Sequence, residues 1–186
     1  YMRFDKEYIA EILFGFSSDT YDVLGIVKKG NFFEIDEKEL RKKIKSFVGE
    51  YKQKIPEYSS YKFKGKPLFY YARKGISLDE INKDVKINKI KFDSFYKISN
   101  NKLLKYINKK IGKVKGDFRQ HEILSNWEYL LKNDEKYFVA KIIIDCGSGT
   151  YIRAIADDIG KSYGGALLLS LKRNRVGKFF IKYSVK

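Results

Sequence analysis

One arginine and the turn before it are the residues of this sequence best suited to chemistry. The stretch "DCGSGTYIRAIADDIG" (145–160) follows a run of apolar residues and opens a helical pattern at Thr150. Arg153 falls in the first turn of that helix, where the helix dipole favours anions over cations. Its position therefore predicts a negatively charged partner. The alternative is a plain strand–turn–helix corner, in which Gly149 allows the tight turn and Thr150 caps the helix.

Two aspartates in an earlier loop are candidates for acid–base work. Asp19 and Asp22 stand three residues apart in "DTYD", within a loop rich in Ser, Asp and Gly (15–25). Aspartates in such loops also form Asx turns, in which the carboxylate accepts from nearby backbone N–H groups, and that interpretation needs no catalytic role. His121 lies in a polar helical context, so we interpret it as a surface residue rather than a base.

A third stretch combines positive charge with aromatic rings. "YKFKGKPLFYYARKG" (61–75) interleaves lysines and one arginine with phenylalanine and tyrosine. Cations neutralise phosphates and aromatic rings stack on bases, so this pattern is typical of contact with a nucleic acid. An ordinary amphipathic hairpin and helix would give the same pattern.

Composition limits the partners and the compartment. The 186 residues carry 39 Lys and Arg against 23 Asp and Glu, a net charge of +16, which favours a polyanionic partner, with nucleic acid first. A lysine-rich composition inherited from an AT-rich genome would also give this excess. One Cys and one His exclude an internal disulfide and a Cys/His zinc site. No apolar run approaches the ~18 residues of a membrane span, so we expect a cytoplasmic protein without a membrane partner.

The elements that must position these residues predict an α+β fold: a mostly antiparallel mixed sheet with packed helices and a helical insertion. Strands are predicted over residues 7–14, 32–35, 58–63, 84–98, 137–145 and 166–181, with a bulge near Asn88. Helices are predicted over 37–52, 67–75, 101–132 in two pieces, and 151–164. Asp36 and Glu39 fit a capping box at the start of the first helix. The apolar stripes of 101–132 need a partner surface, so Trp127 is expected in the core.

Four blocks of the sequence, in order, resemble the bacterial tRNA pseudouridine synthase B (TruB) family. They are "KEYIAEILFGFSSDTYDVLG" (6–25), "QKIPEYSSYKFKGKPLFYYARKG" (53–75), "CGSGTYIRAIADDIG" (146–160) and "LKRNRVGKF" (171–179). They are similar to the family's K-x-Y…T-D-T-x-D, thumb, G-T-Y-I-R and L-R-R-T-x-V-G-x-F stretches. The resemblance implies the pseudouridine synthase-like fold, with a thumb-like segment over 53–76 that grips tRNA.

The resemblance also implies roles for individual residues. Tyr8 matches the tyrosine that stacks on the flipped-out base and is implicated in removing the C5 proton. Arg153 matches the arginine that pairs with the catalytic aspartate, and Leu171 matches a leucine of the same pocket. The implied RNA contacts are Lys62, Lys66, Arg73, Tyr151, Lys172 and Arg173. The implied reaction is isomerisation of uridine to pseudouridine in the T-loop of tRNA, with no cofactor and no metal.

Some family features have no match. No stretch resembles the G-x-L-D-P-x-A-x-G block that holds the nucleophilic Asp, and Asp19 and Asp22 occupy other positions. We therefore expect the nucleophile to come from a missing N-terminal segment, in cis or in trans, and the chain alone to be inactive. One alternative is a non-catalytic tRNA- or RNA-binding relative, and another is a basic structural or interaction domain that does not bind RNA specifically.

The expected organisation follows from these matches and gaps. Residues 1–186 would form the central and C-terminal part of the catalytic domain, with a helical insertion over 99–136 and no PUA domain after Phe179. The expected partner is the T-arm of tRNA, bound by a monomer. Arg153 would face no acid of this chain, since Asp157 and Asp158 lie further along the helix, so Arg153→Ala should cost the chain little stability.

Overall fold

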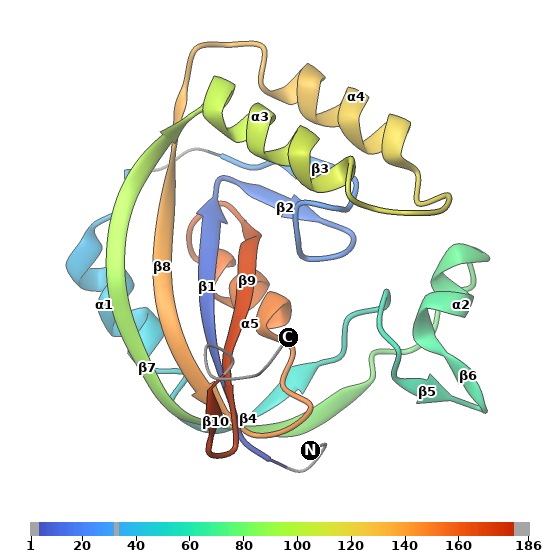
Figure 1. Cartoon of the computed structure of the whole chain (residues 1–186), viewed down its shortest axis with the longest axis vertical. Coiled ribbons are helices and arrows are strands. Elements are labelled where there is room, and N and C mark those ends of the chain that lie inside the picture. Colours follow the sequence, from blue (N-terminus) through green and yellow to red (C-terminus); the bar gives the residue numbers. More distant parts are fainter. Residues whose placement is uncertain (1–3, 32–33, 181–186) are drawn as a thin grey trace.

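An antiparallel sheet forms the centre of the computed structural model, which describes residues 4–31 and 34–180 (Figure 1). Its six strands are β1 Lys6–Phe14, β4 Gly49–Lys54, β7 Asn82–Ser99, β8 Lys136–Cys146, β9 Ala166–Val176 and β10 Phe179–Phe180. They follow the order β10-β9-β1-β8-β7-β4, and every neighbouring pair is antiparallel.

Shorter elements surround this sheet. Two pairs of short strands lie outside it: β2 Phe16–Ser18 with β3 Val27–Lys29, and β5 Lys62–Phe63 with β6 Lys66–Pro67. The helices of the described residues are α1 Glu37–Lys45, α2 Leu68–Arg73, α3 Asn100–Ile111, α4 Gln120–Leu130 and α5 Ile152–Gly160. None of these helices is long and apolar enough to cross a membrane. The α+β fold class predicted from the sequence is confirmed.

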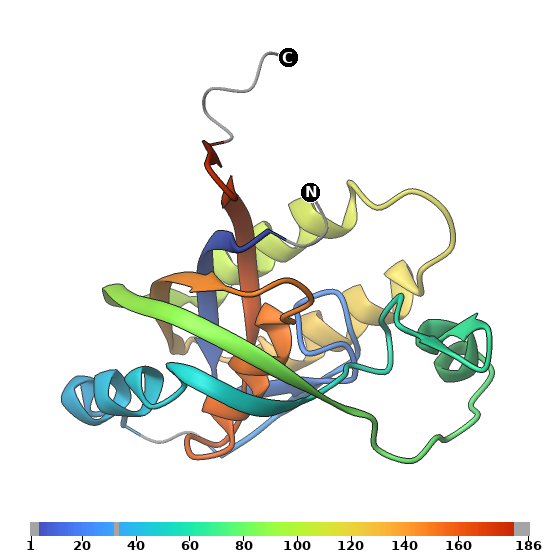
Figure 2. The same cartoon turned by 90° about the horizontal axis from the view of Figure 1, so that it is seen from below.

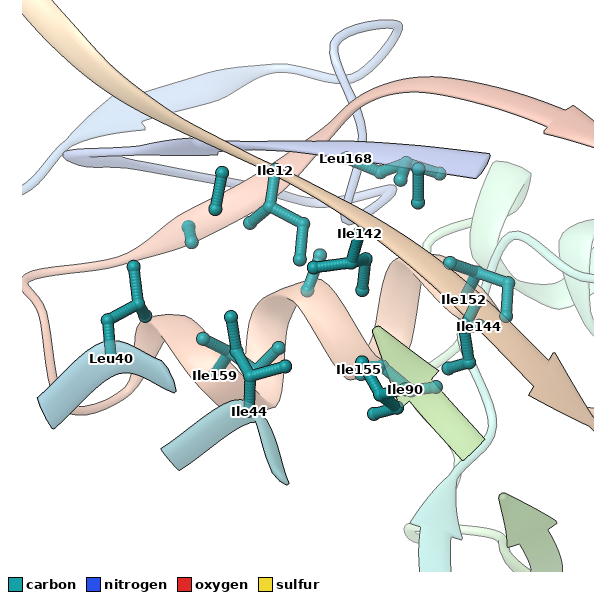
Figure 3. Packing of buried hydrophobic residues seen from close by; sticks show 14 of the residues in the cluster. Ile12, Leu40, Ile44, Ile90, Ile142, Ile144, Ile152, Ile155, Ile159 and Leu168 are labelled. Atoms are coloured by element: carbon teal, nitrogen blue, oxygen red, sulfur yellow. The ribbon is translucent and has the colours of Figure 1, made fainter. Parts of the chain in front are cut away.

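Helices α1 and α5 cover one face of the sheet. Alternate residues of a strand point to opposite faces, so β1, β8 and β9 contribute buried residues to two separate cores. In the first core, Ile44 of α1 and Ile155 of α5 meet Ile142 of β8 and Ile12 of β1 (Figure 3). The buried stripe of α5 therefore fixes this helix against the strands, and with it the position of the residues in its first turn.

The hairpin of α3 and α4 covers the other face. Leu103 and Ile107 of α3 and Trp127 of α4 are fully buried there, together with Leu13 of β1. The indole N–H of Trp127 donates to the carbonyl of Val23 at 3.1 Å. The prediction that Trp127 is a core residue is confirmed. Figure 2 shows the hairpin lying apart from α1, on the opposite side of the sheet.

Two local sequence predictions are confirmed. The register of β7 against β8 shifts between Ile87 and Lys89, at the predicted bulge near Asn88. The carboxylate of Asp36 caps α1 by accepting from the backbone N–H of Lys38 at 2.7 Å and of Glu39 at 3.0 Å.

Other element boundaries were predicted wrongly. The helix predicted over 37–52 ends at Lys45 with Ser46 as its C-cap, and the rest of the predicted helix is replaced by a turn and by β4. Gly49, the first residue of β4, has a φ of 117°, which no helix accommodates. Of the strand predicted over 58–63, the structure keeps only β5. Residues 34–35 are not in a strand; residues 32–33, like residue 181 of the last predicted strand, lie outside the described residues.

Candidate active site

A pocket of about 340 Å³ lies where β1, β9, the 15–25 loop and the start of α5 meet. Tyr8, Arg153 and Leu171, the three residues predicted as catalytic, all line it, and so do Asp22 and Lys110. The remaining lining residues are Val23, Leu24, Thr150, Tyr151, Ile152, Leu168, Leu169 and Ser170. The fold therefore brings together side chains that are widely separated in the sequence.

Neighbouring strands place the aromatic and apolar side chains of the pocket. Tyr8 on β1 stands opposite Arg173 on β9, next to a shift in strand register, and the guanidinium carbon of Arg173 lies 5.8 Å from the centre of the Tyr8 ring. Leu171 on β9 keeps 42% of its surface exposed. The pocket thus offers an aromatic ring and an open apolar side chain close to a cation.

Helix α5 presents Arg153 towards the 15–25 loop. Its Nη1 donates to the carbonyl of Thr20 at 3.1 Å, and its Nη2 donates to the carbonyl of Tyr58 at 2.7 Å. Nη1 also lies 3.5 Å from Oδ2 of Asp22. These acceptors offset the unfavourable placement of a cation in the first turn of a helix. The expectation that Arg153 faces no acid of this chain is wrong, because Asp22 faces it.

Asp22 also stabilises the turn in which it lies. Its Oδ1 accepts from the hydroxyl of Thr20 at 2.8 Å and from the backbone N–H of Leu24 at 2.9 Å. The contact of its other oxygen with Arg153, at 3.5 Å, is long for a charge-assisted hydrogen bond, which is usually about 2.7–2.9 Å. The carboxylate is therefore held mainly by its own loop, with one oxygen turned towards Arg153.

Asp19 binds a different arginine. Its Oδ2 forms an ion pair with Arg119 at 2.8 Å, and its Oδ1 accepts from the backbone N–H of Ile26 at 2.8 Å. The guanidinium of Arg119, just before α4, also lies 5.2 Å from the centre of the Tyr58 ring. The two aspartates of "DTYD" thus bind different arginines. Arg119 connects the α3–α4 hairpin to the 15–25 loop and to Tyr58, whose carbonyl accepts a hydrogen bond from Arg153.

A buried glutamine fixes the start of α5. Gln53 on β4 is 1% exposed; its Oε1 accepts from the backbone N–H of Tyr151 at 2.8 Å, and its Nε2 donates to the Tyr151 carbonyl at 3.1 Å. Gly149 has a φ of 83°, so the predicted role of this glycine in the turn is confirmed. The predicted cap is wrong: the N-cap is Tyr151, and the Thr150 hydroxyl donates to the Gly147 carbonyl at 2.9 Å.

Sequence reasoning missed the role of Gln53. Its one signal was that it opens the 53–75 block that resembles the TruB family. Its partner lies 98 positions further along the chain, so no local pattern connects the two.

The predicted RNA contacts fall into two groups. Tyr151 lines the pocket, and Lys172 and Arg173 are exposed on β9 beside it. Lys62, Lys66 and Arg73 are exposed on β5, β6 and α2, which stand to the side of the sheet in Figure 1. The structure therefore brings only the first group to the pocket.

Two cations of the second group, Lys66 and Arg73, pack on aromatic rings. The ammonium of Lys66 lies 4.3 Å from the centre of the Tyr70 ring and donates to its hydroxyl at 3.1 Å. The guanidinium carbon of Arg73 lies 5.4 Å from the Phe69 ring and 5.1 Å from the ring of Phe118, in the loop between α3 and α4. Hydrogen bonds from Lys74 and then Lys66 lower the pKa of Tyr70. This surface thus combines exposed cations with the part-exposed or exposed rings of Phe69, Tyr70 and Phe118.

Comparison with known proteins identifies the family of this chain. A family model described as TruB family pseudouridylate synthase (N terminal domain) matches residues 1–108. The chain therefore belongs to the TruB family.

Curated relatives extend the match to nearly the whole chain. The tRNA pseudouridine synthase B of Fusobacterium nucleatum is 30% identical over 179 residues, which cover 96% of this chain and 48% of that protein. The tRNA pseudouridine synthase B of Bordetella pertussis is 32% identical over 185 residues, which cover 97% of this chain and 59% of that protein. The chain thus spans roughly half the length of the curated relatives it matches.

A solved structure described as a Cbf5-Nop10-Gar1 complex shares the fold. It aligns with a TM-score of 0.51 at 16% identity, over 97% of this chain and 32% of the other. At this identity the likeness concerns the fold alone.

Proposed function

We propose that this chain forms the central and C-terminal part of a tRNA pseudouridine synthase catalytic domain, which isomerises uridine to pseudouridine in the T-loop of tRNA. The observation that carries the proposal is the convergence of Tyr8, Arg153 and Leu171 on one pocket. The family match and the names of the relatives support both the reaction and the substrate class. The reaction has no redox step, so no cofactor enters the proposal, and its place is the cytoplasm.

The pocket suits a single nucleotide that has left its stack. Enzymes that act on a base within folded nucleic acid extrude it into a pocket and hold it between aromatic and apolar side chains. The volume of about 340 Å³ is at the small end of the range of ligand pockets, roughly 300–1,000 Å³. In the proposed complex the uracil stacks on Tyr8 and packs against Leu171.

The nucleophile is the part of the site that these residues do not provide. We propose that an Asp within a G-x-L-D-P-type block, from a segment outside the 186 residues, completes the pocket. Arg153 would hold that carboxylate. The contact of Asp22 with Arg153 at 3.5 Å is loose enough for a second carboxylate to compete for the guanidinium. A carboxylate beside a guanidinium stays ionised, as a nucleophile must.

The reaction itself rearranges bonds within one nucleotide. The bond between C1′ and N1 breaks, the base turns while it is held, and C1′ bonds to C5. The proton on C5 is removed, with Tyr8 near the base, and N1 gains a proton. Substrate and product are isomers, so no further reactant is needed.

Within the proposed domain, residues 53–76 act as the thumb and residues 99–136 as an insertion. Lys62, Lys66 and Arg73 are exposed, and Lys66 and Arg73 pack on aromatic rings, which supports a role in gripping the T-arm. Tyr151, Lys172 and Arg173 would contact the RNA close to the pocket. The pocket residues of the proposed site all come from one copy of the chain, so the proposed enzyme acts as a monomer.

A non-catalytic RNA-binding relative is the second candidate, because no stretch of these residues matches the nucleophile block. The test is to fuse a G-x-L-D-P-x-A-x-G segment of a family member before Tyr1 and incubate the product with tRNA. Carbodiimide treatment and reverse transcription then map pseudouridine. We expect one modified uridine, in the T-loop, and its loss in the Tyr8→Ala variant. Normal tRNA binding without modification would favour the non-catalytic relative.

A further inference from the structure

The two helices of the α3–α4 hairpin differ in charge. Helix α3 carries Lys102, Lys105, Lys109 and Lys110 and has no acidic residue. Helix α4 carries Glu122 and Glu128 and has no lysine or arginine. The sequence contains lysines but no acidic residue at all between Asp93 and Asp117. The positive charge of the hairpin is therefore concentrated on one helix and the loop that follows it.

Three of the four lysines of α3 point away from the core. Leu103, Ile107 and Ile111 form the buried side of the helix, at most 3% exposed. Lys102, Lys105 and Lys109 lie at the opposite side and are exposed, at spacings that bring them onto one stripe. The stripe is about 10 Å long, at 1.5 Å per residue.

The stripe continues into the following loop and is not neutralised by the protein. Lys113 and Lys115 are exposed there. Among residues 4–31 and 34–180, the ion pairs of the structure involve none of the five lysines at 102, 105, 109, 113 and 115. Like charges one turn apart on a helix repel each other, so an anion bound along the stripe would relieve that repulsion.

This basic surface adjoins the candidate active site. Lys110, on the same helix, lines the pocket together with Tyr8 and Arg153. The hydroxyl of Tyr106 donates to the carbonyl of Leu169 at 3.2 Å, which ties α3 to β9 beside the pocket. In Figure 1, α3 lies across one end of the sheet, whereas α2 stands at its side. A ligand too large for the pocket can therefore reach both surfaces.

We propose that these five lysines, which we call the α3 face, bind the phosphate backbone of the RNA whose target uridine enters the pocket. The proposal rests on the proposed function and adds a second RNA-binding surface to the thumb. A lysine ammonium is a point charge on a flexible stem, suited to phosphates rather than to base edges. The α3 face therefore adds affinity and orientation, with no selectivity for sequence.

The test compares two sets of lysines in the 186-residue chain. One variant replaces Lys102, Lys105 and Lys109 with Gln, whose helix propensity is close to that of Lys, so α3 should keep its structure. The matched control replaces three exposed lysines of α1 and β4 with Gln, at positions 38, 45 and 52. The dissociation constant for tRNA is measured over a range of salt concentrations. Thermal melts establish that both variants are folded.

We expect the α3 variant to bind tRNA at least about tenfold more weakly at low salt, with the slope of log K against log salt reduced by about two to three units. The control should bind like the unmodified chain, and Lys→Arg at the three α3 positions should preserve binding. An unchanged slope in the α3 variant, or an equal loss in the control, would overturn the inference. If a thumb variant loses tRNA binding and the α3 variant does not, the inference about the α3 face is overturned but the proposed function is not. If the unmodified chain does not bind tRNA, both the inference and the proposed function fail.

Discussion

Arg153 on α5 reaches Asp22, 131 positions earlier in the chain, with Nη1 and Oδ2 3.5 Å apart. This contact joins the "GTYIR" turn to the "DTYD" loop at the wall of one pocket. The backbone carbonyls of Thr20 and Tyr58 complete the surroundings of the guanidinium. The side chain of Arg153 is only 19% exposed, so these acceptors compensate for its removal from water.

The environment of Arg153 makes this arginine important to stability. We expect Arg153→Ala to lower the free energy of unfolding by about 1–3 kcal/mol, because two carbonyls and a carboxylate lose their donor. This reverses the expectation from sequence alone. Arg153→Lys keeps the charge but not the fork of donors, so its loss should be intermediate. Urea denaturation measures all three proteins, and a stability of Arg153→Ala equal to that of the unmodified chain would refute the structural role.

The predicted thumb should bind phosphates. Replacement of Lys62, Lys66 and Arg73 with Ala should weaken binding to all tRNAs alike and lower the slope of log K against log salt by about one unit per contact. The three side chains are exposed, so the fold should be unaffected. Salt-dependent tRNA binding measures the effect. A triple variant with the slope of the unmodified chain would mean that these cations only face solvent.

Trp127 should report a buried environment. It is the one tryptophan of the chain, it is fully buried, and its indole N–H is hydrogen-bonded. We expect blue-shifted fluorescence that tRNA leaves unchanged and that shifts to the red when the chain is unfolded in urea. Emission typical of exposed tryptophan, quenched on addition of tRNA, would contradict the packing of α4.

Asp157 should make stability depend on pH. Burial raises the pKa of its carboxyl, an effect that Lys161 opposes and Asp158 reinforces. The folded state therefore holds the proton more tightly than the unfolded state, so stability falls as pH rises from the unfolded pKa, about 3.9, through the higher folded pKa. We expect Asp157→Asn to be more stable than the unmodified chain at pH 7 and to lose this advantage at pH 3.

The neighbouring aspartate supplies the control for this prediction. Asp158 forms an ion pair with Lys161 at 2.5 Å, and so Asp158→Asn should not stabilise the chain at pH 7. Urea denaturation at the two pH values compares the variants. Equal stabilisation by both substitutions, or none by Asp157→Asn, would show that burial of Asp157 carries no cost.

Local patterns predicted the elements that have strong local causes. The cap at Asp36, the bulge near Asn88 and the apolar stripes that bury Trp127 depend on residues a few positions apart. The boundary between α1 and β4 was missed because apolar spacing continues past Lys45 while the backbone changes direction at Gly49. The helical spacing of apolar residues does not show that one residue, Gly49, has a positive φ.

The candidate site could be predicted only in part from the sequence. The resemblance to the TruB family selected Tyr8, Arg153 and Leu171, and the structure places all three at one pocket. The partner of Arg153 could not be predicted, because Asp22 has a sufficient local role in its own turn. The link from Arg119 to Asp19 spans 100 positions and joins a hairpin to a loop with no shared pattern.

Release of tritium from tRNA labelled at C5 of uridine tests the proposed activity most directly. The 186-residue chain is compared with the chain fused to a segment that carries the nucleophile block. We predict no release by the chain alone and release by the fused protein, reduced by about 10²-fold or more in its Arg153→Ala variant, since the nucleophile would lose its orienting partner. Release by the 186-residue chain alone, or a fused Arg153→Ala variant that keeps the full rate, would contradict the assignment of this pocket.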